Sequence, residues 1–334
     1  MSPDGSGAIT RSDSFGGCDS HTPLRSIKPY LRTMLSMLLY YLVILPISYL
    51  PFSLLYRLSD VLYVVLYGVF KYRRAVVAMN LERSFPEKNK NELLDIERKF
   101  YRHLCDLVVE GLKGFNTSYS QVKERMKIMN PEVIDRYFEQ GKSVVIVGGH
   151  YGNWEMFALA IDKRIKHKAV ALYTPLQDKY IDNKVRASRS KYGLFMLSIA
   201  EIRENLASSK DQLTATIFGS DQAPSKKQRA YWMTFLHQET PVQFGTEKFA
   251  KAYDMPVVYG IIQKVKRGHF EFTFKDITAT PNSTEYGWIT QTHTKMLEET
   301  IQKQPEYWLW SHKRWKRTRP EGEELHEPLD AKDQ

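Results

Sequence analysis

Cysteine is scarce in this sequence of 334 residues, which contains only Cys18 and Cys105. The two lie far apart and form no C-x-x-C pair, so neither a disulfide framework nor a cysteine-based zinc site is expected. A reducing compartment such as the cytoplasm fits this scarcity best.

Several catalytic motifs are absent as well. The sequence contains no G-x-S-x-G nucleophile elbow, no G-x-G-x-x-G dinucleotide loop and no G-x-x-x-x-G-K-[ST] phosphate loop. These absences remove the usual support for a hydrolase, a dehydrogenase or an NTPase. Because H-E-x-x-H and clustered Cys and His residues are also missing, we predict no metal and no cofactor.

Acidic residues are outnumbered: 38 Asp and Glu stand against 48 Lys and Arg, which gives a formal net charge of +10. Such a charge predicts an anionic partner, which is nucleic acid, an anionic membrane surface or an acidic substrate. Hydrophobic residues make up 43% of the chain and charged residues 26%, as in globular proteins. The composition therefore excludes wholesale disorder and a membrane protein of many spans.

The longest apolar run extends from Thr33 to Tyr56 without a charged residue. It is long enough to cross a hydrocarbon core, which needs roughly 20 residues. Three interpretations are open: a transmembrane helix, a helix-turn-helix broken at Pro46 and Pro51 that lies in the membrane interface, and a buried core hairpin. A further apolar stretch at 61–70 is too short to span a membrane alone. We predict membrane attachment through this region.

Four regions follow from these patterns. Residues 1–26 are rich in Gly, Ser and Asp, so we predict a disordered leader, and the late start of the apolar run excludes a signal peptide. Residues 27–72 form the hydrophobic membrane-attachment segment, and residues 73–320 form an α/β domain. The acidic residues 321–334 are predicted to be a disordered tail.

Short β-branched runs alternate with helical stretches in the central region. Apolar residues at mostly helical spacing predict an amphipathic helix over 91–114. Strands are predicted at 143–149, 168–173, 213–219 and 255–265. The alternating stretch 269–277 predicts a late hairpin or an edge strand. The fold class is therefore α/β, with a mainly parallel sheet flanked by helices.

The segment 143–162 is the most informative for chemistry, because an apolar strand runs through two glycines into His150. Ligands of open α/β sheets bind at the carboxyl ends of strands. Asn153 is a suitable N-cap, which places Glu155 in the first helical turn. On one continuous helix His150 and Glu155 would point about 140° apart, so His150 must lie in the loop. Glu155 can then hydrogen-bond one imidazole nitrogen while the other acts as a base.

A histidine supported by a carboxylate can take a proton from an alcohol while that alcohol attacks an acyl carbonyl. Backbone amides near Gly152 and Asn153 could support an oxyanion or a phosphate. The competing interpretation is structural, with His150 capping the helix and Glu155 on the surface. The strand-Gly-Gly-His context favours a site over that alternative.

Five segments together resemble the late acyltransferases of the bacterial lipid A biosynthesis acyltransferase family. They are RRAVVAMNLERSFPEKN at 73–89, GGHYGNWE at 148–155, VRASRSKYG at 185–193, SDQ at 220–222 and EYWLWSHKRWKRTRP at 306–320. The match extends in consistent order over about residues 28–320. It implies a fold like that of the glycerolipid acyltransferases and a His-x4-Asp/Glu catalytic dyad, here His150 and Glu155.

The resemblance also implies substrate-binding residues. Arg186 and Arg189 match a basic segment that contributes to the site, where a guanidinium can hold phosphate or polarise a thioester carbonyl. The alternative for both is a solvated basic face. Asp221 and Gln222 match an Asp-Gln pair, which could instead form a plain turn.

The basic stretch 312–319 contains Lys313 and Arg314 and no acidic residue. We expect it to contact a substrate phosphate or the membrane surface, with Trp308, Trp310 and Trp315 at the interface. Single-stranded nucleic acid also binds basic residues mixed with aromatic rings. We predict no nucleic-acid binding, because no nucleic-acid fold signature accompanies the cluster.

The expected function is a membrane-associated O-acyltransferase. It would move a fatty acyl chain from acyl carrier protein or acyl-CoA to a hydroxyl of a lipid A precursor, at the cytoplasmic face of the bacterial inner membrane. One alternative is the same chemistry on another glycolipid, an aminolipid or a lysophospholipid. The alternative of another class is a non-catalytic basic protein that binds the membrane surface.

Overall fold

A computed structural model describes residues 24–198, 201, 212–225 and 230–327 of the chain. Of the predicted leader, residues 1–23 lie outside the described residues, as do residues 328–334 of the predicted tail. The first helix begins at Leu24, and His326 near the other end stacks on the ring of Tyr231. The four region boundaries stay predictions.

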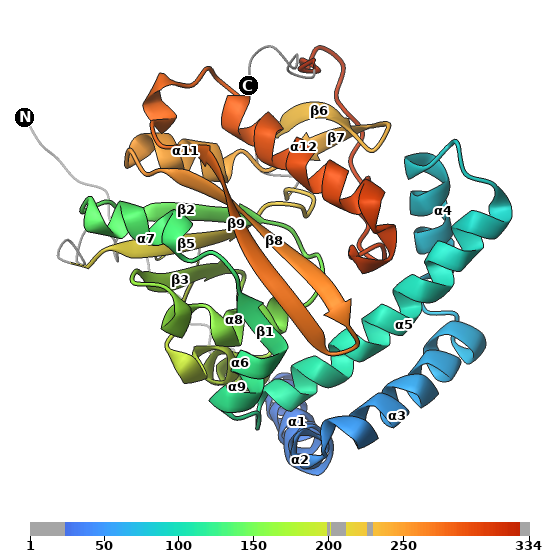
Figure 1. The fold of residues 1–334 in the computed structure, drawn as a ribbon. Coiled ribbons are helices and arrows are strands. Elements are labelled where there is room, and N and C mark those ends of the chain that lie inside the picture. The colour runs from blue at the N-terminus through green and yellow to red at the C-terminus, as the bar shows by residue number, and fades with distance from the viewer. Residues whose placement is uncertain (1–23, 199–200, 202–211, 226–229, 328–334) are drawn as a thin grey trace, which may run out of the picture.

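A seven-stranded sheet forms the centre of the molecule (Figure 1), in the order β1-β9-β8-β2-β5-β3-β4. Its strands are β1 (Met126–Ile128), β2 (Val144–Gly148), β3 (Lys168–Tyr173), β4 (Phe195–Ser198), β5 (Thr214–Gly219), β8 (Val257–Lys266) and β9 (His269–Thr278). Neighbouring strands run parallel except β8 and β9, which pair antiparallel. The predicted α/β class with a mainly parallel sheet is confirmed.

The four predicted strands of the central region are all present, and the stretch 269–277 forms the second arm of the β8–β9 hairpin. This stretch is not an edge strand, because β1 pairs with its outer side. Strands β1 and β4 were not predicted from the sequence, since they are only three and four residues long. The separate hairpin of β6 (Tyr231–Phe235) and β7 (Gln238–Val242) was not predicted either.

Helices cover both faces of the sheet (Figure 1), which explains why the sequence of β2 is apolar throughout. Val144 and Ile146 belong to one core cluster, while Val145 and Val147 belong to the other. A strand buried on both faces needs no polar alternation. The covering helices are α4 (Arg74–Ser84), α5 (Lys90–Gly114), α6 (Tyr119–Arg125), α7 (Glu132–Glu139), α8 (Trp154–Ala160), α9 (Lys179–Arg189), α11 (Gly245–Ala252) and α12 (Trp288–Lys303).

Helix α5 confirms the helix predicted over 91–114. A capping box starts it, in which Asn89 accepts from the amide of Glu92 and Glu92 accepts from the amide of Asn89. One face of α5 carries buried polar side chains: His103, Asp106, Glu110 and Lys113. Their spacing of three or four residues places them on the same side of the helix.

The N-terminal residues 31–70, which we call the apolar hairpin, form two helical arms. The first consists of residues 31–39 of α1 (Leu24–Leu39), a π-helical turn (Tyr40–Ile44) and α2 (Leu45–Tyr49). The second consists of α3 (Phe52–Tyr63) and a π-helical segment (Val64–Val69). The arms meet at Leu50 and Pro51, where Leu50 has ψ 143° and is extended, because a residue before proline avoids the helical region.

The predicted break at Pro46 is wrong. The helix passes through Pro46, which lies in the first turn of α2 directly after the π-helical turn. The preceding π-helical turn, in which the amide of Leu45 donates to the carbonyl of Tyr40, accommodates a proline within the continuous helix. Only Pro51 breaks the segment.

The apolar hairpin exposes most of its apolar side chains. Leu31–Tyr49 and Phe52–Val69 are long and apolar enough to cross a membrane, yet only 6% and 17% of them are buried. Leu42 is 69% exposed and Phe70 is 73% exposed. Exposure of this extent excludes the buried core hairpin among the three interpretations.

Candidate active site

His150 lies where strand β2 ends, beside the end of its neighbour β5. Gly148 of β2 is in register with Gly219 of β5, and the amide of Ser220 donates to the carbonyl of Gly148 at 3.0 Å. The residues that follow the two strands are therefore side by side. This register brings His150 and Asp221 together, although 71 positions separate them in sequence.

Asp221 is the carboxylate that holds His150. Its Oδ1 lies 2.6 Å from Nδ1 of His150, and its Oδ2 accepts from the His150 backbone amide at 2.9 Å. The indole N–H of Trp308 also donates to Oδ2, at 2.9 Å. A carboxylate accepts only, so the proton of the neutral imidazole resides on Nδ1 and leaves Nε2 with a lone pair. The Nε2 atom of Gln222 lies 3.4 Å from Nε2 of His150.

Buried charges set the protonation of this pair. Burial would lower the pKa of His150, but the charge and hydrogen bond of Asp221, with the nearby charge of Glu155, raise it above its ordinary value. Burial would raise the pKa of Asp221, but the charge and hydrogen bonds of His150 and the Trp308 N–H lower it to about 2. Asp221 is thus ionised across the physiological range, and it stabilises a protonated His150.

The expected hydrogen bond between Glu155 and His150 is wrong. Both Glu155 oxygens instead accept from the guanidinium of Arg189, with Nε at 2.8 Å and Nη2 at 2.5 Å. A bidentate pair with a planar guanidinium satisfies the Glu155 carboxylate more fully than one imidazole N–H would. Asp221 occupies Nδ1 in its place. Glu155 remains near enough for its charge to raise the pKa of His150.

Arg186 and Arg189 differ in their surroundings, although both lie on α9. Arg189 is held by Glu155. Arg186 donates to the carbonyl of Met196 at 3.4 Å, and its guanidinium lies 5.6 Å from the ring centre of Tyr173. Their roles in binding substrate stay predictions.

The backbone after His150 is already engaged. The amide of Gly152 donates to the carbonyl of Tyr307 at 3.0 Å, so the predicted oxyanion or phosphate support from Gly152 is wrong. The side chain of Asn153 caps α8 by accepting from the amide of Met156 at 2.8 Å. Gly152 has φ +64°, and a Cβ there would lie 2.6 Å from the side chain of Ile262. Only glycine fits this position without displacement.

A buried glutamate of α5 links this loop to the apolar hairpin. Glu110 accepts from the Asn153 side-chain amide at 2.6 Å and from the Tyr56 hydroxyl at 2.8 Å. Burial is the main reason why the pKa of Glu110 rises to about 7, against hydrogen bonds that lower it. The loop is also held by His103, whose Nε2 lies 3.1 Å from the carbonyl of Gly152.

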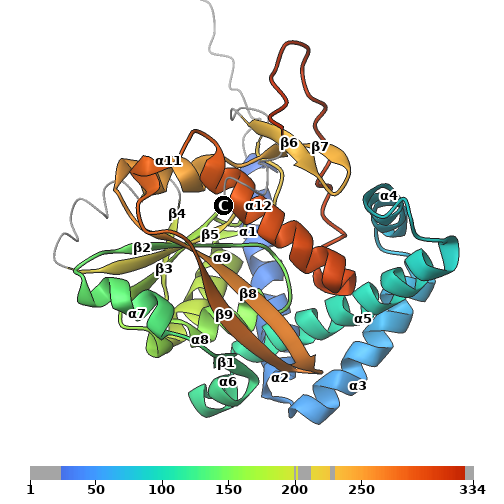
Figure 2. The same ribbon diagram turned by 45° about the horizontal axis from the view of Figure 1, so that its top comes forward.

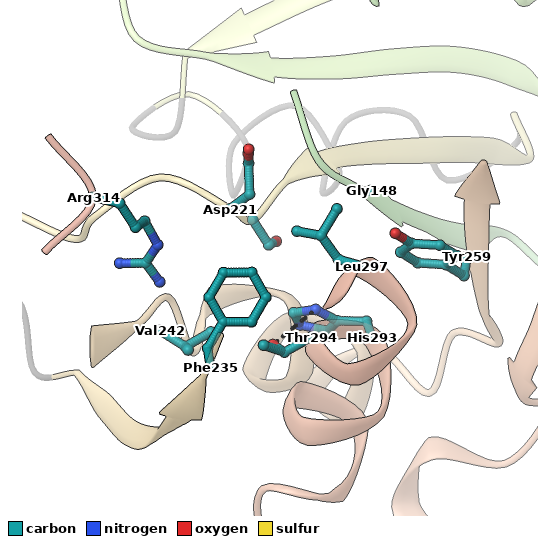
Figure 3. Close-up of a pocket in the computed structure, with 10 residues that line it drawn as sticks. Gly148, Asp221, Phe235, Val242, Tyr259, His293, Thr294, Leu297 and Arg314 are labelled. Carbon is teal, nitrogen blue, oxygen red and sulfur yellow. Dashed lines mark hydrogen bonds between the residues drawn. The ribbon is translucent and has the colours of Figure 1, made fainter. Parts of the chain in front are cut away.

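Arg314 is buried, which contradicts its predicted contact with a substrate phosphate. Only 2% of the residue is exposed. Figure 3 shows Arg314, Phe235, Val242 and His293 around a cavity of about 10 Å³ beside Asp221, which has room for about one water molecule. Burial lowers the pKa of Arg314 to about 10, and the charge of Asp221 opposes this shift. Arg314 is therefore an internal cation.

The tryptophans of the C-terminal segment are also more buried than predicted. Trp308 and Trp310 lie in the core, so their predicted interfacial position is wrong. Each indole N–H has an internal partner, which is Asp221 for Trp308 and the carbonyl of Pro305 for Trp310. Trp315 is half-buried and donates to Thr240 at 2.7 Å. Lys313 is exposed, and its contact with substrate stays a prediction.

The pairing of Asp221 with His150 was missed because it depends on strand order. The sequence does contain a signal, since S-D-Q follows a buried strand as G-G-H does. Only the adjacency of β2 and β5 tells which carboxylate reaches the imidazole. Within the part of the chain that the structure describes, no group of three or more His, Cys, Asp or Glu could hold a metal ion.

Fold and site together define an α/β protein with a histidine–aspartate pair at the strand ends, an arrangement suited to base catalysis. A sequence model described as bacterial lipid A biosynthesis acyltransferase matches residues 27–317. The chain belongs to this family, and it is an enzyme that transfers acyl groups. The non-catalytic alternative is thereby set aside.

Named relatives are similar to the chain at low identity. A lipid A biosynthesis palmitoleoyltransferase of Escherichia coli K12 is 22% identical over 255 residues, which cover 76% of this chain and 81% of the relative. A lipid A biosynthesis lauroyltransferase of the same strain is 21% identical over 275 residues, which cover 82% and 88%. A lipid A biosynthesis acyltransferase of Shigella flexneri is 22% identical over 255 residues, with coverage of 76% and 81%.

Proposed function

We propose that this enzyme transfers a fatty acyl chain from the thioester of acyl carrier protein or coenzyme A to a hydroxyl group of a lipid A precursor. The observation that carries the proposal is the His150–Asp221 pair, which leaves the lone pair on Nε2 of His150, next to the Gln222 side-chain amide, to accept a proton at the strand ends. Membership of the family supports the acyl chemistry, and the names of the relatives support the acceptor.

The proposed reaction is a single displacement at the thioester carbonyl. Nε2 of His150 takes the proton of the acceptor hydroxyl as its oxygen attacks the carbonyl carbon. Asp221 stabilises the imidazolium that forms. The tetrahedral intermediate collapses, the carbon–sulfur bond breaks, and the imidazolium returns the proton to the leaving thiolate. No acyl-enzyme is required.

Other side chains have proposed supporting roles. The side-chain amide of Gln222 lies next to Nε2 of His150, where it can donate to the acceptor oxygen or to the developing oxyanion. The Glu155–Arg189 pair holds α8 against α9; the charge of Glu155 raises the pKa of His150, and the charge of Arg189 opposes this shift. Arg186 and the exposed Lys313 are proposed to contact phosphate or carbonyl groups of the substrates.

We also propose that the apolar hairpin attaches the enzyme to the cytoplasmic face of the inner membrane. Its exposed apolar side chains support this placement, since large exposed apolar patches mark interaction surfaces. The first hairpin arm contacts α9, which carries Arg189: Ser36 of α1 donates to the α9 N-cap Asp178 at 2.5 Å, and Tyr40 of the π-helical turn packs edge-on against Tyr180. An acceptor embedded in the same membrane would reach His150 without leaving the lipid surface.

The test is turnover by the full-length enzyme in neutral detergent. A lipid A precursor with an acyl-carrier thioester should gain the mass of one acyl chain, and parallel reactions with acyl-CoA identify the donor. His150→Ala should reduce kcat by about 1,000-fold or more, because the base is lost. Acylation of lysophospholipid alone would favour the alternative acceptor, and unchanged turnover of the variant would falsify the mechanism.

A further inference from the structure

A second cavity, separate from the strand-end site, lies between the apolar hairpin and the core. Its volume is about 300 Å³, which is at the lower end of the range for ligand pockets. Its walls come from α3, α5, the turn of the β8–β9 hairpin and Tyr307. Both ribbon views place this turn beside α5 and near α3 (Figure 2). The six charged residues that line it are Asp60, Arg102, Asp106, Lys264, Lys266 and Arg267.

The two acids of this cavity are matched by two of its cations. Arg267 Nη2 lies 2.7 Å from an oxygen of Asp60 and 2.7 Å from an oxygen of Asp106. Lys264 lies 3.5 Å from the other Asp106 oxygen. These pairs connect α3, α5 and the β8–β9 turn, so they fix the shape of the cavity.

The other two cations are the ones available to a ligand. Arg102 lies over the ring of Tyr63 at 5.2 Å, and Lys266 stands at the β8–β9 turn. Both are exposed, and neither forms an ion pair among the described residues. Four cations against two acids leave the cavity with a surplus of two positive charges.

One exposed apolar side chain lines the same cavity, and another lies one helical turn beyond its wall on the second hairpin arm. Val265, at the β8–β9 turn, is 59% exposed, and so is Val64. Val64 follows Asp60 by four residues, which places both on one face of the second hairpin arm. A positive cavity with an apolar rim is complementary to a phosphate group at the level of lipid headgroups, where the acyl chains contact the rim.

We infer that this cavity binds the phosphate headgroup of an anionic membrane phospholipid, distinct from the acyl acceptor. The inference rests on the proposed attachment of the apolar hairpin to a membrane. Arg102 and Lys266 contact the phosphate oxygens, and Arg267 with Asp60 and Asp106 keeps the cavity open. The lipid would hold the second hairpin arm at the membrane surface.

The experiment compares binding of the full-length protein to phosphatidylcholine vesicles and to vesicles in which one lipid in three is phosphatidylglycerol. In the double variant Arg102→Gln with Lys266→Gln, the ratio of binding to anionic over neutral vesicles should fall about 30-fold. Each basic residue near the surface contributes about 1 kcal/mol. Its binding to neutral vesicles should not change. A matched control, Lys248→Gln with Lys275→Gln, removes two exposed charges elsewhere and should keep the preference.

Three outcomes would overturn the inference. The control variant could lose the preference as much as the cavity variant, which would mean that only net charge matters. The cavity variant could raise KM for the lipid A precursor in neutral detergent, which would assign the cavity to the acceptor. Inorganic phosphate could occupy the cavity in detergent while the vesicle preference stays intact in the variant. Failure of acyl transfer by the unmodified enzyme would refute the proposed function. It would not affect the comparison of vesicle binding.

Discussion

At the scale of single residues, the site depends on which carboxylate reaches the imidazole. Asp221 and Glu155 both raise the pKa of His150, but only Asp221 hydrogen-bonds it. The H-x4-E pattern pairs His150 with Glu155, which is near in sequence. The order of strands in the sheet places Asp221 next to His150 in space. The catalytic partner of His150 is therefore proposed to be Asp221, with Glu155 as a positioning residue for α9.

Asp221→Asn and Glu155→Gln should separate these roles. Asp221→Asn removes the charge that holds the imidazolium, so we expect kcat/KM to fall by about 1,000-fold or more. His150 must be neutral to act as a base, so activity declines as pH falls through its raised pKa. Loss of Asp221 lowers the pKa of His150, so the decline of activity at acidic pH (the acid limb of the pH profile) should move to lower pH.

Glu155→Gln is the matched comparison, because it also replaces one carboxylate by an amide. It breaks a bidentate pair with Arg189 and leaves the His150–Asp221 bond in place, so we expect a smaller loss, about tenfold, and a smaller shift of the acid limb. The measurement is kcat/KM against pH for both variants. A larger loss and a larger shift in Glu155→Gln would return the partner role to Glu155.

At the scale of elements, α5 connects the apolar hairpin to the loop between β2 and α8, which contains His150. Glu110 accepts one hydrogen bond from Tyr56 on α3 and one from Asn153, the N-cap of α8. Burial raises its pKa from 4.5 to about 7. The folded enzyme therefore retains a proton on Glu110 between those pH values, where the unfolded chain has released it.

Glu110→Gln should reveal this proton by its effect on stability. The stabilisation from the raised pKa is complete below pH 4.5 and is lost as pH rises through about 7. The variant lacks that dependence, so its deficit in unfolding free energy should shrink by about 2–3 kcal/mol between pH 5 and pH 8. Thermal unfolding at the two pH values measures it. The exposed Glu132→Gln should show no such trend, and a deficit that grows with pH would contradict the prediction.

Much of the element pattern was accessible from the sequence, because apolar runs and helical spacing report burial directly. This is why the strands of the central region, the helix over 91–114 and the strand-end position of His150 were predicted correctly. Strand order was not accessible, and so the Asp221 pairing was missed. Burial of Arg314 and Trp308 could not be predicted either, since basic and indole side chains enter a core only when distant segments supply their surroundings.

At the scale of the whole molecule, a polar enzyme domain carries one large apolar surface. Most of the exposed large apolar side chains lie on the apolar hairpin, which is beside α9 and α5 (Figure 1). Part of the positive charge lies inside the molecule, at buried Arg314, and part lines the cavity between the hairpin and the core.

Leu42→Glu with Phe70→Glu should release the enzyme from membranes. Each substitution places a charge on an exposed apolar position, so partition onto neutral vesicles should fall at least about tenfold. Turnover in detergent should be retained, because neither side chain touches the site. Tyr253→Glu, at the exposed position that caps the end of α11, is the control and should still bind. Undiminished partition of the double variant would refute attachment through the hairpin.

The buried polar face of α5 fixes the position of the site relative to the apolar hairpin. Lys113 donates to the carbonyl of Ser48, Asp106 accepts from Ser59, and Glu110 accepts from Tyr56, so three contacts tie α5 to both hairpin arms. Apolar packing tolerates sliding because it is not directional, whereas hydrogen bonds fix distance and angle. His150 is therefore held at a fixed distance from the hairpin, and with the hairpin in a membrane, as proposed, that distance would select which hydroxyl of an embedded acceptor the imidazole reaches.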